Sequence, residues 1–228
     1  MISNVLLPAS FRREQGSRMA GALLLYVTVV LGFTLILGGC SVLPKKMPLT
    51  VYVLRPASIE TSVQPNAAIV QIHAPRSSGI LSSSSIAVMP NAQQMSVYSG
   101  ARWDDILPRL VQDYLIQNFR TAAAFEAVID TDSRIVPDYH LISDLRAFHS
   151  SYTHAGHNRG NPMVEVEFDV QLIDAYARTI VAQRRFSVVE PSSGTEVDVV
   201  VQAFNRAAAT LSAELLEWTA QNIAPHEG

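Results

Sequence analysis

The sequence predicts an α+β fold, in which an antiparallel β-sheet meander carries two amphipathic helices packed on one face. Two segments, 139–148 and 164–172, alternate apolar and polar residues with a period of two, and a third strand is expected at 179–189. This period is typical of strands that have one buried and one wet face. Two further segments, 103–119 and 197–218, carry apolar stripes at helical spacing. The helices supply the layer that the apolar face of the sheet requires.

Short strands are expected before and after the first helix. Each is rich in β-branched or aromatic residues, and several of them end at a proline. The expected strands are 50–54, 67–73, 85–89, 95–98 and 125–129.

The first helix is predicted over 103–119 because its apolar residues recur at intervals of three, one and four. The stripe consists of Trp103, Ile106, Leu107, Leu110, Val111, Tyr114, Leu115 and Phe119. Pro108 lies close enough to the start of this helix to be tolerated. The stripe of the second helix consists of Val197, Val200, Val201, Phe204, Ala208, Leu211, Leu215 and Trp218.

The three long strands expected at 139–148, 164–172 and 179–189 are joined by polar connections. A Gly/Asn/His-rich hairpin loop is expected at 150–162, and a turn near 174–178. Residues 191–194, Pro-Ser-Ser-Gly, separate the last strand from the second helix.

Length and charge narrow the functional classes. The 228 residues fit one ordinary domain with an appendage, and the formal net charge is −3. Residues 40–228 carry 14 Lys and Arg against 19 Asp and Glu, without a basic cluster. Nucleic acid is therefore excluded as an expected partner, because binding its phosphates requires a basic patch. The single cysteine, Cys40, forms neither an internal disulfide nor a cysteine-pair metal site.

The N-terminus has the layout of an export signal. Arg12, Arg13 and Arg18 precede a run from Ala20 to Gly39 that contains no charged residue. A positive flank followed by an apolar stretch and small residues is typical of such signals. A run of about 20 apolar residues is also long enough to span a bilayer as a helix. Its length alone does not separate a cleaved leader from a membrane anchor.

The end of the run favours cleavage. Leu37-Gly38-Gly39-Cys40 resembles the bacterial lipobox, in which an aliphatic and two small residues precede a lipidated cysteine. The resemblance implies cleavage between Gly39 and Cys40 and lipidation of the Cys40 thiol. Several acyl chains on one cysteine give stable anchoring, whereas a single chain does not. An uncleaved anchor that happens to end in a cysteine is the alternative.

This reading divides the chain into a lipoprotein signal peptide (1–39), a lipidated tether (40–49), a folded domain (50–222) and a short tail (223–228). Ser41 follows the cysteine, where aspartate would signal retention in the inner membrane of enteric-type bacteria. The expected location is the periplasmic face of the outer membrane. The periplasmic face of the inner membrane is the alternative.

The order of features from 40 to 222 resembles the ABC-type transport auxiliary lipoproteins, the family of PqiC-like proteins. After the lipobox come Tyr52-Val53-Leu54, then Val97-Tyr98 before the tryptophan-led stripe of 103–119. Tyr139-His140-Leu141 opens a strand, an acidic alternating strand follows, and the last helix ends near Trp218.

The resemblance implies a non-catalytic accessory component of an envelope system that moves phospholipid or other hydrophobic molecules. The implied partners are an Mce-domain protein and the permease and ATPase of an ABC transport system. Membrane attachment runs through the N-terminal lipid, and a homo-oligomer is possible by analogy. An envelope-assembly lipoprotein that binds a biosynthetic enzyme or a secretion complex remains the alternative, and a tethered hydrolase ranks below both.

Histidines in the expected hairpin loop are the most tempting metal ligands. His149, His154 and His157 cluster in sequence, and histidine is the commonest metal ligand. No carboxylate or cysteine lies beside them in the loop to complete a site, so a solvated hairpin is the favoured interpretation. No metal and no cofactor is expected.

Other polar groups also favour structural roles. Glu165, Glu167 and Asp169 share one strand face, as an acid–base pair would require, but they alternate with Val and Phe and are expected to face solvent. The serine run 82–85 has no nucleophile-elbow context. Trp103, Tyr114, Phe119, Phe204 and Trp218 are expected in the core rather than in a ligand site. No catalytic constellation is predicted, and the chain is not expected to be an enzyme.

Overall fold

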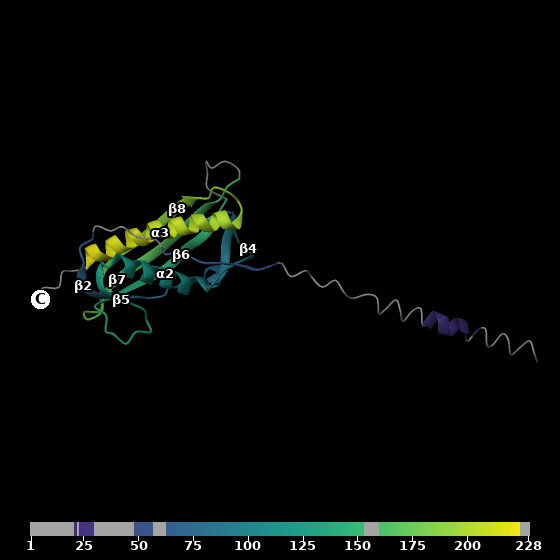
Figure 1. The fold of residues 1–228 in the computed structure, drawn as a ribbon, viewed down its shortest axis with the longest axis horizontal. Helices are drawn as coiled ribbons and strands as arrows, with labels where there is room; N and C mark the ends of the chain where they lie inside the picture. Colours follow the sequence, from purple (N-terminus) through teal and green to yellow (C-terminus); the bar gives the residue numbers. More distant parts are fainter. Residues whose placement is uncertain (1–20, 22, 30–47, 57–62, 153–159, 224–228) are drawn as a thin grey trace, which may run out of the picture. The chain divides into compact units, whose positions relative to one another are not determined.

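The computed structural model describes residues 21, 23–29, 48–56, 63–152 and 160–223. The chain divides into two units, Met1–Lys46 and Met47–Gly228. In the first unit, residue 21 and residues 23–29 are helical and exposed. The second unit contains the sheet and both long helices (Figure 1).

The second unit confirms the predicted α+β class. Its described residues form an eight-stranded sheet, the helices α2 and α3 and the short 3-10 helix η1. In chain order the elements are β1 (Thr50–Tyr52), β2 (Asn66–Ile72), η1 (Gly79–Ser82), β3 (Ser85–Asn91), β4 (Gln94–Trp103), α2 (Leu107–Ala122), β5 (Phe125–Ile129), β6 (Tyr139–Ser151), β7 (Met163–Asp174), β8 (Thr179–Pro191) and α3 (Val197–Asn222).

The sheet is organised around β6. On one side, β6 pairs with β7 in antiparallel register from Tyr139 opposite Asp174 to Ser151 opposite Met163, and β7 pairs with β8 in the same way. These three strands form the predicted meander. For β6 and β7, the alternation of apolar and polar residues in the sequence indicated both the strands and their buried face.

The other side of β6 is shared by two shorter strands. The end of β2 pairs in parallel with the start of β6, and β3 pairs in parallel with the end of β6. Between them, Arg76 makes an isolated bridge to Asp144. The sheet continues from β2 to β5 and from β3 through β4 to β1. Four of these pairings are parallel (β1–β4, β2–β5, β2–β6 and β3–β6), which a simple meander does not contain.

Both helices lie on the same face of the sheet, as predicted (Figure 1). α3 packs on β7 and β8, while α2 packs on β5, β2 and η1. Their buried stripes and the inward residues of the strands form one continuous hydrophobic core.

The first helix begins later than its apolar stripe predicts. Trp103 ends β4, and α2 starts at Leu107 with Pro108 in its first turn. Proline is favoured there because it has no N–H to donate and its φ already suits a helix. Ile106, counted in the predicted stripe, is half exposed, whereas Trp103 is fully buried. The predicted stripe therefore ran from the end of a strand into the following helix, and the predicted start of the helix was wrong.

An aromatic cluster joins three elements at the centre of the core. Trp103 of β4 meets Phe148 of β6 and Phe204 of α3 edge-on, with ring centroids 5.8 Å and 5.5 Å apart. Phe148 and Phe204 stack on each other at 4.9 Å. All three side chains are fully buried, so this cluster attaches α3 to the sheet.

Replacing Phe204 by alanine should lower the free energy of unfolding by about 3–5 kcal/mol, because the cavity left beneath α3 cannot close completely. Denaturant unfolding measures the change. Met95→Ala, at an exposed position of β4, serves as the control and should stay within about 0.5 kcal/mol of the parent. Equal effects of the two substitutions would contradict the central position of the cluster.

Candidate functional site

The predicted processing site lies outside the described residues. These include neither Gly39 nor Cys40, and of the apolar run they contain only residues 21 and 23–29. Within the described part of the chain, no helix is both long and apolar enough to cross a membrane. Cleavage after Gly39 and lipidation of Cys40 therefore stay predictions.

A row of ion pairs crosses the sheet on the side chains that point away from the core. Arg76 donates to Asp144 from Nε and Nη2, both at 2.8 Å. Arg146 Nε lies 2.7 Å from Asp169 Oδ2, and Arg185 Nε lies 2.7 Å from Asp169 Oδ1. The row links the segment after β2 to β6, β7 and β8. It ties together strands that are distant in sequence.

The acidic residues in this row do not form an acid–base pair. Hydrogen bonds from Arg185 and then Arg146 lower the pKa of Asp169 to about 2. A general acid or base needs a pKa near the working pH, so this carboxylate is not poised for proton transfer. Glu167 lies 3.5 Å from Arg185 on the same partly exposed face. Asp169 and Glu167 of β7 therefore form ion pairs with arginines of the neighbouring strands.

The histidines that looked like a metal site are only partly described. His149 is buried in β6, with its Nε2 atom 3.6 Å from Glu165 of β7. His154 and His157 lie outside the described residues. Across the residues that the structure does describe, no group of three or more metal-ligating side chains occurs.

The serine run makes local backbone contacts. Ser82 Oγ donates to the carbonyl of Gly79 at 2.7 Å, and Ser83 Oγ donates to that of Ile80 at 2.8 Å. Ser83 Oγ also accepts from the amide of Ser85. These hydroxyls stabilise η1 and the start of β3, which is a structural role for side chains of this kind.

Another pair of histidines, which the sequence did not reveal, lies between β2 and β6. His73, just after β2, and His140 of β6 face each other with Nε2 and Nδ1 3.1 Å apart. Burial, followed by the charge of His140, lowers the pKa of His73. The two rings share one proton in their hydrogen bond, so protonating both would remove it. The residues are 67 positions apart, and only the parallel β2–β6 pairing brings them together.

A groove of about 680 Å³ lies between the segment that follows the tether and α3. Val51, Val53 and Pro56 form one wall, and Val201 and Ala209 form the other. Val51 and Val53 are both close to half exposed. Arg55 and Arg206 also line the groove. The guanidinium of Arg206 is paired with Glu190, whereas Arg55 forms no ion pair within the described residues. The described lining therefore combines apolar walls with the positive charge of Arg55.

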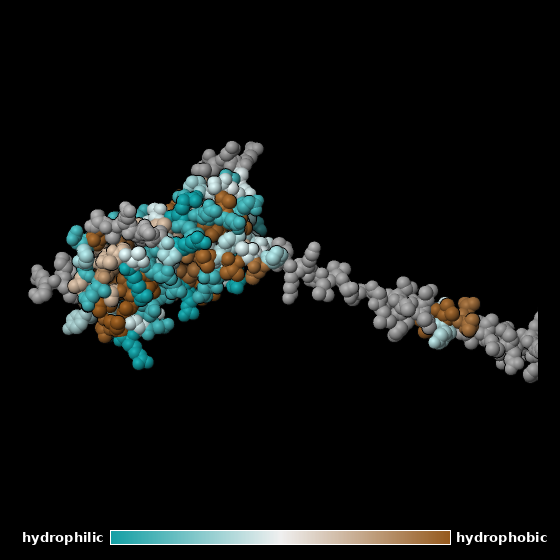
Figure 2. Space-filling view, in the orientation of Figure 1, coloured by the Kyte–Doolittle hydropathy of each residue, from teal (hydrophilic) through white to brown (hydrophobic). Residues whose placement is uncertain are grey.

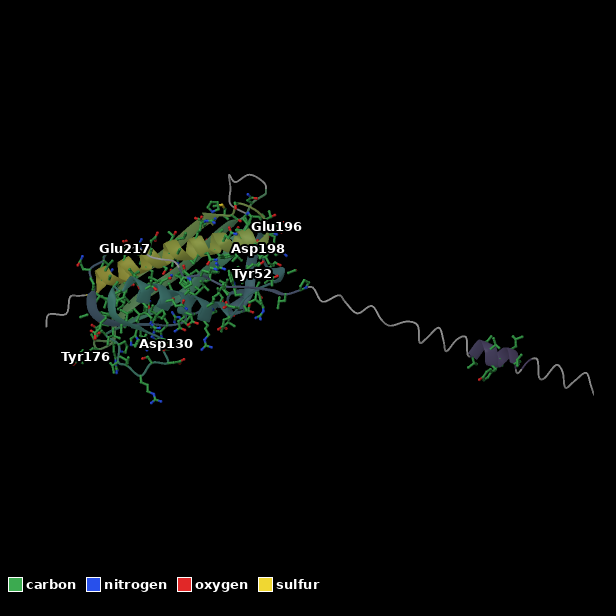
Figure 3. The ribbon with its side chains drawn as sticks, viewed as in Figure 1. Tyr52, Asp130, Tyr176, Glu196, Asp198 and Glu217 are labelled. Carbon is green, nitrogen blue, oxygen red and sulfur yellow. The ribbon has the colours of Figure 1, made fainter. Side chains whose placement is uncertain are left out.

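Two hydrogen bonds connect the two walls of the groove. Tyr52 donates its hydroxyl to Asp198 in the first turn of α3, and both residues are labelled in Figure 3. This hydrogen bond raises the pKa of Tyr52 to about 12, so the phenol remains a donor at any physiological pH. Farther along, the amide of Arg55 donates to Asn205 Oδ1 at 2.8 Å.

Comparison with known proteins places this architecture in a family. A family model described as "ABC-type transport auxiliary lipoprotein component" matches residues 52–215. The chain belongs to this family. The matched region begins at the last residue of β1 and ends in α3, so it includes β2 to β8 and most of the residues that line the groove.

Two solved structures share this fold. The crystal structure of protein XCC0632 from Xanthomonas campestris has a TM-score of 0.70 and 28% identity, and the match covers 76% of this auxiliary lipoprotein and 95% of that chain. An uncharacterized protein of known structure shares the fold at a TM-score of 0.57 and 13% identity, covering 75% of this chain and 98% of its own.

The match to a curated relative covers a smaller part of both chains. An uncharacterized protein of Bradyrhizobium diazoefficiens is 30% identical over 117 residues, which are 51% of this chain and 30% of that protein. The chain therefore matches less than a third of the length of this relative.

The histidine pair makes a pH-dependent prediction. Because the pKa of His73 is lower in the folded state than its ordinary value near 6.5, the unfolded state takes up the proton more readily. The stability that His73 contributes is present above about pH 6.5 and is lost as the pH falls below it. The difference in unfolding free energy between the parent and His73→Gln should therefore shrink from pH 7.5 to pH 5.5. A constant difference across this range would contradict the proposed pairing.

Proposed function

We propose that this protein is a non-catalytic accessory subunit of an ABC/Mce-type system, anchored by lipid to the periplasmic face of the outer membrane, and that the system transports phospholipid or other hydrophobic molecules. The observation that carries the proposal is the family match over residues 52–215, which begins twelve positions after a lipobox cysteine. A chain with this order carries its membrane attachment and its transport-associated domain in one polypeptide.

The chemistry of the described surface supports a binding role. The ion pairs on the open face are satisfied among themselves, and the serine run caps local structure. The groove beside α3 is complementary to a phospholipid, because its apolar walls suit an acyl chain and Arg55 suits a phosphate. Arg55 forms no ion pair within the described residues, so its guanidinium is available to an anion.

The proposed partners are the Mce-domain protein, the permease and the ATPase of the same system. In this proposal the domain acts by docking to those subunits. A homo-oligomer is part of the proposal by analogy with the ring-shaped assemblies that such a subunit would meet.

Cys40→Ala should leave residues 1–39 attached and abolish lipidation, because the thiol that accepts the lipid is gone. Mass spectrometry of the membrane-extracted protein measures both changes, with Ser41→Ala as the matched control that should be processed normally. Ser41→Asp should move the lipoprotein from the outer to the inner membrane in a density-gradient fractionation. A cleaved and acylated Cys40→Ala protein would refute the anchor.

Partnership is tested by crosslinking in intact cells that express the whole transport system. Affinity purification of the full chain should recover an Mce-domain protein of that system, identified by mass spectrometry. The folded but unlipidated Cys40→Ala variant should recover less, because it is not held at the same membrane. Repeated absence of every subunit of the system from the crosslinked material would contradict the proposed function.

A further inference from the structure

One end of the domain exposes apolar side chains to an unusual degree. On the loop between β5 and β6, Val136 is 82% exposed and Ile135 is 52% exposed. On the turn between β7 and β8, Tyr176 is 98% exposed, and Ile180 directly after it is 53% exposed. Figure 2 shows apolar atoms at this end, where Figure 1 draws β5 and the two loops. We call residues 130–138 and 174–180 the loop tip.

The loop tip is held in a defined shape. In the turn, Asp174 Oδ1 accepts from the amides of Tyr176 at 2.9 Å and Ala177 at 2.7 Å. In the longer loop, Asp130 Oδ1 accepts from the amides of Asp132 and Ser133, both at 3.0 Å.

The two loops are also bonded to each other and to the sheet. The amide of Ala175 donates to the carbonyl of Asp138 at 2.9 Å, and Asp138 exchanges hydrogen bonds with the backbone of Ile69 in β2. A recess of about 550 Å³ lies between them, lined in part by Val136, Pro137 and Tyr176. Because the loops are already ordered, a partner that binds them has little conformational entropy to remove.

The loop tip lies at the far end of the domain from β1. It flanks the start of β6, where Tyr139 pairs with Asp174. The chain enters the domain at β1, which is connected through β4 and β3 to the end of β6. The two places are about 30 Å apart along β6, at roughly 3.3 Å per residue. Figure 3 shows this separation, with Tyr176 and Tyr52 labelled at opposite ends.

The charge of the loop tip selects among possible occupants. Its two segments contain four aspartates and two arginines, a net charge of −2. Asp130, Asp132 and Asp174 form no ion pair within the described residues, so their charge is not neutralised there. A surface of this sign is repelled by anionic lipid headgroups, and two copies of it repel each other. A protein surface with an apolar recess rimmed by Lys and Arg is complementary to it.

We propose that the loop tip is the docking surface for a subunit of the ABC transport system, and that this subunit presents an apolar recess rimmed by basic residues. The inference rests on the proposed function and adds the surface and the chemistry of the partner. Tyr176 and Val136 insert into the apolar recess of the partner subunit, as exposed aromatic and aliphatic anchors do at protein interfaces. The aspartates around them meet the basic rim and set the orientation.

The test uses the full-length, lipidated protein in cells that express its transport system. A photo-crosslinking amino acid replaces Tyr176 or Val136, and as the matched control it replaces Met95, which is 40% exposed on β4. Crosslinks to one subunit of the transport system are expected from both tip positions and not from Met95. With the purified partner, Tyr176→Ala should weaken binding at least ten-fold, and Asp132→Lys should weaken it and reduce its dependence on salt. Because Tyr176 and Asp132 are exposed, both variants should unfold at the parent's denaturant midpoint.

Other outcomes overturn the inference. Crosslinks to the transport system from Met95 but not from the loop tip would refute the docking surface and leave the proposed function standing. No such crosslink from any position would refute both. Crosslinks from Tyr176 to a second copy of this chain would assign the loop tip to self-association. Tip-dependent flotation of the unlipidated protein with vesicles of phosphatidylglycerol and phosphatidylethanolamine would assign it to the membrane.

Discussion

The structure depends on the pairing of β6 along both of its edges. On one side β7 pairs with it over nearly its whole length, and on the other side β2 and β3 divide its edge between them. Every other strand is attached through one of these three, and each helix packs on strands of one branch: α3 on β7 and β8, α2 on β2 and β5. Near the end of β6, the cluster of Trp103, Phe148 and Phe204 joins β4, on the β3 side of the sheet, to α3, on the β7 side. One strand therefore fixes how far β1 lies from the loop tip.

The same arrangement explains why charged side chains on the outer face of the sheet pair with one another. On a sheet with one wet face, the outward positions of neighbouring strands are about 5 Å apart, so charges of opposite sign meet across them. Asp144, Arg146, Asp169 and Arg185 do so, and their mutual hydrogen bonds hold the pKa of Asp169 far below neutrality. Two other surfaces of the described residues are accessible: an apolar groove beside α3 that Arg55 lines, and an apolar loop tip with a net negative charge. Both are suited to binding, and they lie at opposite ends of the domain.

Much of this fold could be predicted from the sequence because its signals are local. The alternation in β6 and β7 reports one buried face, and the stripe of α3 reports its packing, each within a single segment. What could not be predicted is non-local. The parallel pairings of β2 and β3 with β6 leave no periodic trace, so the His73–His140 contact was missed. The groove was missed for the same reason, since Tyr52 and Asp198 are 146 positions apart. Trp103 was placed in a helix because its spacing to Leu107 suits one, although Pro108 marks the true first turn. The proposed role of Cys40 rests on sequence chemistry alone.

The central claim is that this protein assists the transport of hydrophobic molecules without catalysing a reaction. The most direct measurement is phospholipid transfer between inner- and outer-membrane vesicles by the reconstituted ABC system, with and without the lipidated protein. The account predicts that transfer of labelled phospholipid falls at least ten-fold when the protein is omitted, while the ATPase subunit still hydrolyses ATP. Transfer that proceeds at the same rate without the protein would contradict it.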